Sequence, residues 1–247
     1  PFVAKTLLWL CLFQIAGIGA VHAAQKEKNI VLIAGPITGH DKYAHEYEKS
    51  VILIKHLLDT CPNLKGVRTQ AYFKGWVPDE SVLDTADTIV YITDGGDHNE
   101  KDHPLYVADR MKALEKQMNR GCGLVMYHWS TFHPTRYHDK ITEWVGGYFD
   151  YETGNTPNHW YSAIQTWNAA TSLPNSEHPI CRGVHPFSQP EEFYYNIRFR
   201  DNDSRLTPIL QTQPPNTSQQ HTVGWAVQRS NGGRGFGFTG GHFYKDW

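Results

Sequence analysis

The sequence lacks the features that would mark a nucleic-acid-binding, disulfide-built or membrane-spanning protein. Its 23 Lys and Arg residues nearly balance its 25 Asp and Glu residues, and no basic run occurs, which argues against binding to nucleic acid or to an anionic membrane surface. Only four cysteines occur in 247 residues, with no spacing typical of a zinc knuckle. No apolar run beyond residue 18 could cross a bilayer, which takes about 20 residues. We therefore expect a soluble domain without membrane attachment.

The N-terminal residues have the pattern of a secretory leader. Lys5 precedes an apolar run over residues 7–18, and Val21 and Ala23 fit the small-residue rule for cleavage. We expect residues 1–23 to be a signal peptide and the protein to be secreted or periplasmic. A buried N-terminal helix is the alternative, but the polar segment QKEKN follows the run directly.

The rest of the chain is long enough for one large domain, which we place at residues 29–247. Cys11 belongs to the expected leader, so Cys61, Cys122 and Cys181 remain. An odd number of cysteines in an oxidising compartment leaves at least one thiol free. Disulfides are therefore not expected to hold the fold together.

Strand and helix patterns alternate in the first half of this domain. Apolar runs and helical periodicity predict strands at Asn29–Gly35, 67–73, Thr88–Asp94 and Gly123–Tyr127, and helices at 45–60, 106–121 and from Arg136 to the following glycines. The helix at 106–121 would bury Val107, Met111, Leu114 and Met118 on one face. Such alternation is typical of a parallel, doubly wound α/β sheet.

After about residue 155 the pattern changes to short strands separated by turns. The strand-like segments are 159–167, 192–199, 207–212, 222–229 and 235–241, with no clear helix among them, and Gln211–His221 reads as a surface loop. We therefore predict a mostly parallel sheet that antiparallel strands extend in the C-terminal half.

Histidines follow four of the predicted strands. The polar residues at these strand ends are His40, His45 and Glu46 after the first strand, Asp94 and His98 after the third, His128 after Gly123–Tyr127, and His242 after the last. Ligands bind in open α/β sheets beyond the carboxyl ends of the strands. Because histidine is rarely needed for packing, this bias indicates acid–base or metal chemistry.

Each of these residues also has a structural interpretation. His40 and His45 could be solvated residues at the start of a helix, and His98 could belong to a polar loop. His128 could be a satisfied core histidine. For Asp94, which precedes two glycines, a turn-forming role is the preferred interpretation.

The order of the motifs carries a family resemblance. The segments GPITGHDKYAHEYE, TIVYITDGGDH, GLVMYHWS, EEFYYNIRF and GRGFGFTGGHF resemble, in the same order, the motifs of the ThuA-like (trehalose-utilisation) family over residues 29–247. The resemblance implies a class I glutamine amidotransferase-like fold, a three-layer sandwich with a flavodoxin-like core. Family members continue into a closing helix, so we expect the chain, which stops five residues after His242, to be truncated and to expose an apolar strip.

In amidotransferases of this fold, a cysteine occupies the sharp turn, or elbow, between a strand and a helix, and a late histidine and glutamate serve it. Here the elbow position holds His128, and His242 falls where the late histidine belongs. Glutamine hydrolysis needs a thiolate at the elbow. Cys122 lies six residues earlier, about 20 Å away at roughly 3.3 Å per strand residue, so amidotransferase activity is not expected.

The resemblance also implies a role in sugar catabolism, with a disaccharide or its keto derivative as the small-molecule partner. The residues permit a mechanism in which neutral His128 is the general base and His242 or Glu192 its acid–base partner, moving a proton next to a carbonyl in an isomerisation or hydrolysis. Glu192 could instead be a solvated strand residue. His159 and Trp160 would form a ring-stacking face, or a simple edge-strand pair.

Two other interpretations of the same residues stay open. One is a non-catalytic sugar-binding module with a decayed amidotransferase-like pocket. The other is a divalent metal site, zinc being the first candidate, since clustered imidazoles with a carboxylate suit that ion. The sequence has no HxH or HExxH spacing, so the ligands are not identified, and His40, His45, His98 and His242 are the first candidates.

Overall fold

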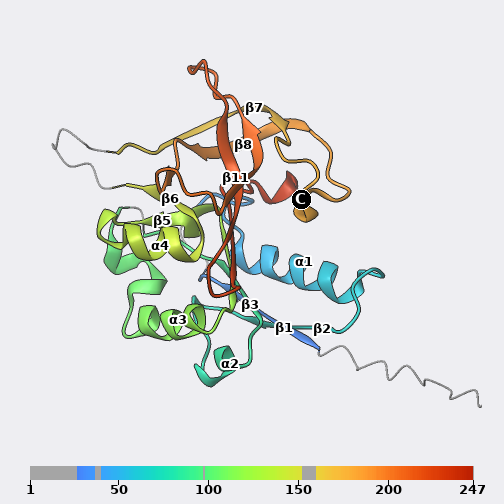
Figure 1. Ribbon diagram of the computed structural model, residues 1–247, viewed down its shortest axis with the longest axis vertical. Coiled ribbons are helices and arrows are strands. Elements are labelled where there is room, and N and C mark those ends of the chain that lie inside the picture. The colour runs from blue at the N-terminus through green and yellow to red at the C-terminus, as the bar shows by residue number, and fades with distance from the viewer. Residues whose placement is uncertain (1–26, 37–39, 97, 152–159, 247) are drawn as a thin grey trace, which may run out of the picture.

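The computed structural model describes residues 27–36, 40–96, 98–151 and 160–246. The expected signal peptide and His159 lie outside these residues. The strands are β1 Lys28–Ala34, β2 Val67–Tyr72, β3 Thr88–Ile92, β4 Gly123–Tyr127, β5 Phe132–His133, β6 Gly147–Asp150, β7 Ala163–Ser172, β8 Ser188–Tyr195, β9 Arg198–Phe199, β10 Leu206–Thr212, β11 His221–Gln228 and β12 Arg234–Phe238. The α-helices are α1 Tyr47–Thr60, α2 Ser81–Asp84, α3 Arg110–Asn119 and α4 His138–Trp144 (Figure 1).

One nine-stranded sheet organises the chain, in the order β2-β1-β3-β4-β12-β11-β10-β7-β8. The strands from β2 to β12 in this order are parallel to their neighbours, and those from β12 to β8 are antiparallel. Strands β5, β6 and β9 form a second, small sheet. The prediction of a parallel sheet extended by antiparallel strands is therefore confirmed.

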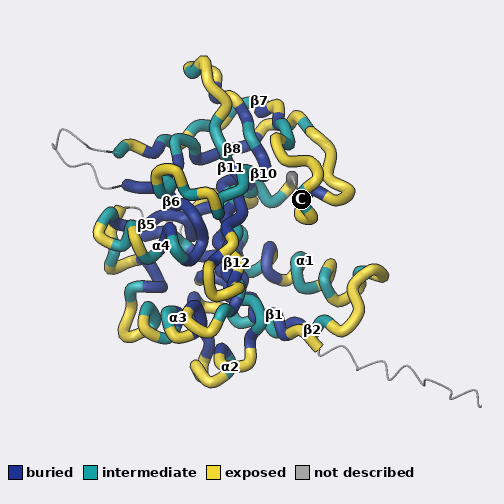
Figure 2. The backbone as a smooth tube through the Cα atoms, in the orientation of Figure 1, coloured by how far each residue is buried: buried dark blue, intermediate teal, exposed yellow. Residues whose placement is uncertain are grey.

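Helices cover both faces of the parallel part, which makes three layers. Helix α1 packs Tyr47 and Val51 against Leu32 and Val90 on one face. The other face is covered by α2, α3 and α4, whose buried residues are Leu83, Leu114, Met118, Ile141 and Trp144. Buried residues follow the strands, and exposed ones lie on the outer sides of the helices and in the loops (Figure 2). This is the flavodoxin-like sandwich that the sequence predicts.

One helix boundary differs from its prediction. Helix α3 begins only at Arg110, because a 3₁₀ turn at Pro104–Tyr106 and a left-handed Ala108, with φ of 52°, precede it. Val107 therefore lies outside the helix and is 43% exposed, so its predicted burial was wrong. Leu114 and Met118 are buried as predicted.

Two buried histidines in the core lead us to expect acid destabilisation. Burial lowers the pKa of His103 to about 3 and that of His133 well below its ordinary value. The unfolded chain therefore binds protons that the folded chain excludes, and stability falls as the pH drops below about 6.5. His103 alone should make unfolding about 2 kcal/mol easier at pH 5 than at pH 7.

Urea unfolding at pH 7, 6 and 5 measures this effect. His103→Gln should flatten the pH dependence by that amount, whereas the control His56→Gln, on the exposed side of α1, should leave it unchanged. Parallel pH dependences for the wild type and His103→Gln would show that this histidine carries no such penalty.

Candidate metal centre

The elbow after β4 places His128 at the carboxyl edge of the sheet. Its backbone is left-handed, with φ of 52°, a conformation that costs a non-glycine residue about 1–3 kcal/mol and clusters at functional sites. Ser130 stabilises the turn, since its hydroxyl oxygen accepts the Tyr127 N–H at 2.8 Å. The His128 side chain is 2% exposed.

A second left-handed histidine lies opposite the elbow. His45, with φ of 52°, lies two residues before the start of α1 and donates its backbone N–H to the carbonyl of His242 at 3.1 Å. This bond joins the loop after β1 to the loop after β12. Two segments almost 200 residues apart in the sequence thus bring imidazoles together.

Glu191, a buried carboxylate of β8, fixes the loop that carries His242. Its oxygens accept the backbone N–H groups of Gly241 at 3.0 Å, His242 at 3.1 Å and Glu192 at 2.8 Å. Gly241 has φ of 91°, and a Cβ there would collide with the Tyr127 ring, which explains the glycine before the histidine. Glu191 thereby positions both His242 and Glu192.

Four side chains converge at this edge: His45, His128, Glu192 and His242 each offer one ligand atom, and all four atoms lie within 4.8 Å of one another. His128 Nε2 lies 3.0 Å from His45 Nε2 and 3.2 Å from His242 Nδ1. Glu192 Oε1 lies 3.1 Å from His242 Nδ1 and 3.8 Å from His128 Nε2. We call these four residues the histidine cluster.

The protonation state of His128 follows from its second nitrogen. Nδ1 lies 2.7 Å from the carbonyl oxygen of Thr239, which can only accept, so Nδ1 carries the proton and Nε2 presents its lone pair to the cluster. Burial lowers the pKa of His128 to about 3, although Glu192 acts in the opposite direction. The imidazole is therefore neutral at physiological pH.

The surroundings also lower the pKa values of His45 and Glu192. Burial, followed by His128, His242 and His40, lowers the pKa of His45 well below its ordinary value. Burial alone would raise the pKa of Glu192, but the hydrogen bond from His242 and the neighbouring histidines lower it overall. At neutral pH, neutral His45 and His128 therefore lie beside an ionised Glu192 carboxylate.

Tyr194 completes the surroundings of His128. Its hydroxyl lies 2.9 Å from His128 Nε2, and the two rings stack with centroids 4.5 Å apart. Burial raises its pKa well above the ordinary value, so the hydroxyl keeps its proton and donates to Nε2. Tyr194 and Glu191 were not predicted as site residues. Strand alternation could have identified Tyr194, because it lies two residues after Glu192 on β8.

The other two predicted residues of the first loop lie near the cluster without joining it. The exposed His40 ring contacts the ring of His45, with centroids 4.2 Å apart, and that of Trp129 at 4.7 Å. Glu46 forms an ion pair with Lys49 at 2.7 Å. Glu46 therefore stabilises the start of α1, where the helix dipole favours negative charge.

The loop after β3 directs His98 away from the cluster. Asp94 accepts the backbone N–H of Gly96 at 2.7 Å, which is the predicted turn. His98 Nδ1 lies 3.2 Å from the carbonyl oxygen of Tyr151, and the His98 ring contacts Phe132. The expectation that His98 is a ligand with His45 and His242 is therefore not met among the described residues, since the turn carries it toward the end of β6.

Trp160 and Cys122, two further residues considered in the sequence, lie in different parts of the fold. The Trp160 indole donates to the carbonyl of Asn196 at 2.7 Å, which ties it to the loop after β8. Cys122 lies at the opposite end of β4 from the elbow, and burial raises the pKa of its thiol to about 11. It is therefore no thiolate nucleophile, and Cys61, Cys122 and Cys181 are all free thiols.

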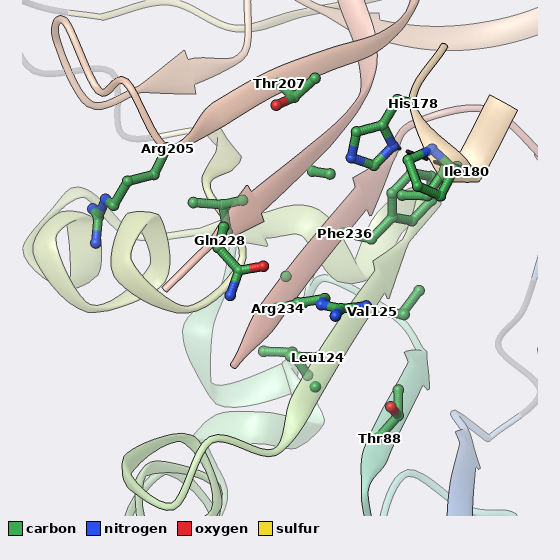
Figure 3. A pocket seen from close by; sticks show the side chains of 15 residues that line it. Thr88, Leu124, Val125, His178, Ile180, Arg205, Thr207, Gln228, Arg234 and Phe236 are labelled. Carbon is green, nitrogen blue, oxygen red and sulfur yellow. Dashed lines mark hydrogen bonds between the residues drawn. The ribbon is translucent and has the colours of Figure 1, made fainter. Parts of the chain in front are cut away.

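A cavity of about 400 Å³ lies elsewhere, over strands β4, β11 and β12 (Figure 3). Apolar side chains such as Val125, Ile180 and Phe236 line it together with His178 and Arg234. No member of the histidine cluster lines this cavity. The concentration of titratable groups therefore marks the candidate site better than cavity size does.

Comparisons with known proteins agree with this architecture. A family model described as trehalose utilisation, ThuA, matches residues 36–247. A ThuA-like protein from Bacteroides uniformis superposes with a TM-score of 0.58 at 16% identity, covering 94% of this chain and 89% of that one. A ThuA-like protein from Parabacteroides merdae gives 0.58 at 15% identity, with coverage of 88% and 80%.

A glutamine amidotransferase from Thermotoga maritima gives a TM-score of 0.45 at 8% identity, with coverage of 88% and 76%. No curated protein is similar enough in sequence to count as a match. Within the described residues, no helix is both long and apolar enough to cross a bilayer.

Proposed function

Because the chain belongs to the ThuA family, whose description is trehalose utilisation, we propose that it is a metal-dependent enzyme of carbohydrate metabolism. It acts on a sugar or keto-sugar by isomerisation or hydrolysis, and the histidine cluster holds a divalent ion at the reaction centre. The convergence of four ligand atoms within 4.8 Å carries this proposal. The leader-like pattern of residues 1–23 supports a secreted or periplasmic location.

Hydrogen bonding alone explains the cluster poorly. His128 Nε2 offers one lone pair, yet His45, His242 and Tyr194 all approach it within 3.2 Å. One lone pair does not satisfy three donors at full strength. A cation shared by the nitrogens accounts for this crowding, because every lone pair then points at a common centre.

The spacing fits such an ion. Zinc–nitrogen bonds of about 2.0–2.1 Å place tetrahedral ligand atoms about 3.3 Å apart. The four contacts that involve His128 or join Glu192 to His242 measure 3.0 to 3.8 Å, and all four ligand atoms lie within 4.8 Å of one another. Three imidazoles and a carboxylate suit zinc and its neighbouring divalent transition metals. Four protein ligands fill a tetrahedral zinc site, so a substrate oxygen would bind as a fifth ligand.

The Thr239 carbonyl supports the same assignment. A metal-bound histidine almost always donates its second ring N–H to a carbonyl or carboxylate, which fixes the tautomer. His128 Nδ1 has this partner at 2.7 Å. The interpretation of His128 as a free general base loses support, because a buried imidazole with a pKa of about 3 is a weak base and three side chains already approach its Nε2 within 3.2 Å.

Two groups would share the chemistry: the ion, and an imidazole that lies beside the histidine cluster. When bound, the ion would polarise the carbonyl of the sugar and so acidify the adjacent C–H group. His40, exposed and in ring contact with His45, is the imidazole placed to take that proton. Isomerisation of a keto-sugar begins with this proton transfer.

Metal content and turnover test the proposal together. Purified protein should contain about one equivalent of a divalent transition metal by elemental mass spectrometry. Removal of the ion with a chelator should abolish turnover of a keto-disaccharide, and stoichiometric zinc, manganese or cobalt should restore it. Full turnover by metal-free protein would refute the metal-dependent mechanism, and ligand binding with no turnover in any metal form would favour the sugar-binding module.

A further inference from the structure

We infer that Tyr194 is a catalytic residue: its hydroxyl donates a hydrogen bond to the substrate oxygen that becomes negatively charged during the reaction. This inference rests on the proposed function and identifies the substrate class more closely. The substrate is a sugar whose carbonyl oxygen turns into an enediolate oxygen beside the ion.

The Tyr194 hydroxyl has a single proton to donate. Tyr194 is 1% exposed, and its hydroxyl lies 2.9 Å from His128 Nε2. The proton on Nδ1, held by the Thr239 carbonyl, leaves Nε2 as an acceptor only. In the metal-free protein Tyr194 therefore donates to that nitrogen.

An ion held by the histidine cluster would use the same lone pair of His128 Nε2. The Tyr194 hydroxyl would then lose this acceptor. A buried donor without a partner costs free energy, so the site with metal bound favours a ligand that returns an acceptor to this position. The ring cannot easily turn away, because it stacks on His128 and contacts Phe132 and Phe149.

The acceptor that fits best is an oxygen that gains charge. When the C–H bond next to the sugar carbonyl breaks, its proton passes to a base, which we assign as His40. The electron pair left behind forms a C=C bond, and the carbonyl π pair moves onto oxygen. Tyr194 keeps its proton and hydrogen-bonds to that oxygen more strongly in the transition state than in the ground state, which accelerates the step.

Acetohydroxamate, whose two oxygens resemble a cis-enediolate, is the probe for this contact. The experiment uses the zinc-loaded protein and compares the wild type, Tyr194→Phe and the control Tyr195→Phe. Tyr195 is the next residue on β8, and its ring contacts Trp167 and His221 instead of the cluster. Titration calorimetry measures the Kd for zinc on the metal-free form of each protein and the Kd for the probe on the zinc-loaded form.

Tyr194→Phe should keep the zinc Kd within about twofold and raise the acetohydroxamate Kd about 10-fold, while kcat on a keto-sugar falls about 100-fold with little change in KM. Tyr195→Phe should match the wild type in all four constants. Unchanged probe affinity in metal-loaded Tyr194→Phe would overturn the role of the tyrosine alone. Failure of the wild type to bind any ion would overturn both this inference and the proposed function.

Discussion

Replacing His128 with alanine is expected to remove the metal and to lower turnover by at least about 1,000-fold. His128 Nε2 lies at the centre of the cluster, within 3.2 Å of both other imidazole nitrogens. Loss of this ligand leaves three of the four ligand atoms, those of His45, Glu192 and His242, which hold an ion less tightly than four. Elemental mass spectrometry and initial rates on a keto-sugar measure the two effects.

A second variant separates metal loss from misfolding. Position 128 has φ of 52°, which strains alanine but is tolerated by asparagine. His128→Asn should therefore keep the wild-type unfolding midpoint more closely than His128→Ala while losing the metal equally. His56→Ala, on the exposed side of α1, is the surface control, and metal retained at one equivalent in folded His128→Asn would rule out His128 as a ligand.

Glu191→Ala should produce the second-largest effect, because this carboxylate accepts three backbone N–H groups of the ligand-bearing segments. Buried amides without an acceptor cost about 1–3 kcal/mol each, so we expect the free energy of unfolding to fall by about 3 kcal/mol. Groups that orient metal ligands typically contribute about 10–100-fold in affinity. The metal Kd should rise by that factor.

The isosteric variant Glu191→Gln should have a smaller effect on stability and on metal affinity than Glu191→Ala, because it keeps the shape and one acceptor oxygen. Glu115→Ala is the matched control, since Glu115 lies on the surface of α3 and pairs with Lys140. Denaturant unfolding and competition with a chelator give the two quantities, and wild-type values for Glu191→Ala would show that the His242 loop holds its position without this carboxylate.

The local sequence predicted most of the architecture for simple physical reasons. Strands such as β1 and β3 are buried on both faces, so their runs of β-branched residues identify them without tertiary information. Helix α1 was predicted equally well from the sequence, because Tyr47 and Val51 recur at helical spacing. The boundary of α3 was not, since the 3₁₀ turn at Pro104–Tyr106 shortens a helix that periodicity alone would extend.

The candidate site was also predictable from the sequence only in part. The histidines at strand ends were expected to gather, because the carboxyl ends of parallel strands meet at one edge of a sheet. His45, His128 and His242 lie together at that edge. His98 also follows a parallel strand, but the Asp94 turn directs its side chain to Tyr151, and no periodicity encodes the direction in which a loop leaves a strand.

The sequence by itself therefore determined the doubly wound α/β sheet, the histidine at the elbow and the absence of a cysteine at that position. Only the tertiary structure decided which residues share the centre. Glu192 and Tyr194 come from β8, an antiparallel strand at the far edge of the sheet order, and Glu191 binds a loop 50 residues away. Local residue patterns carry information over a few residues, whereas these contacts depend on how distant segments pack, which is a property of the whole fold.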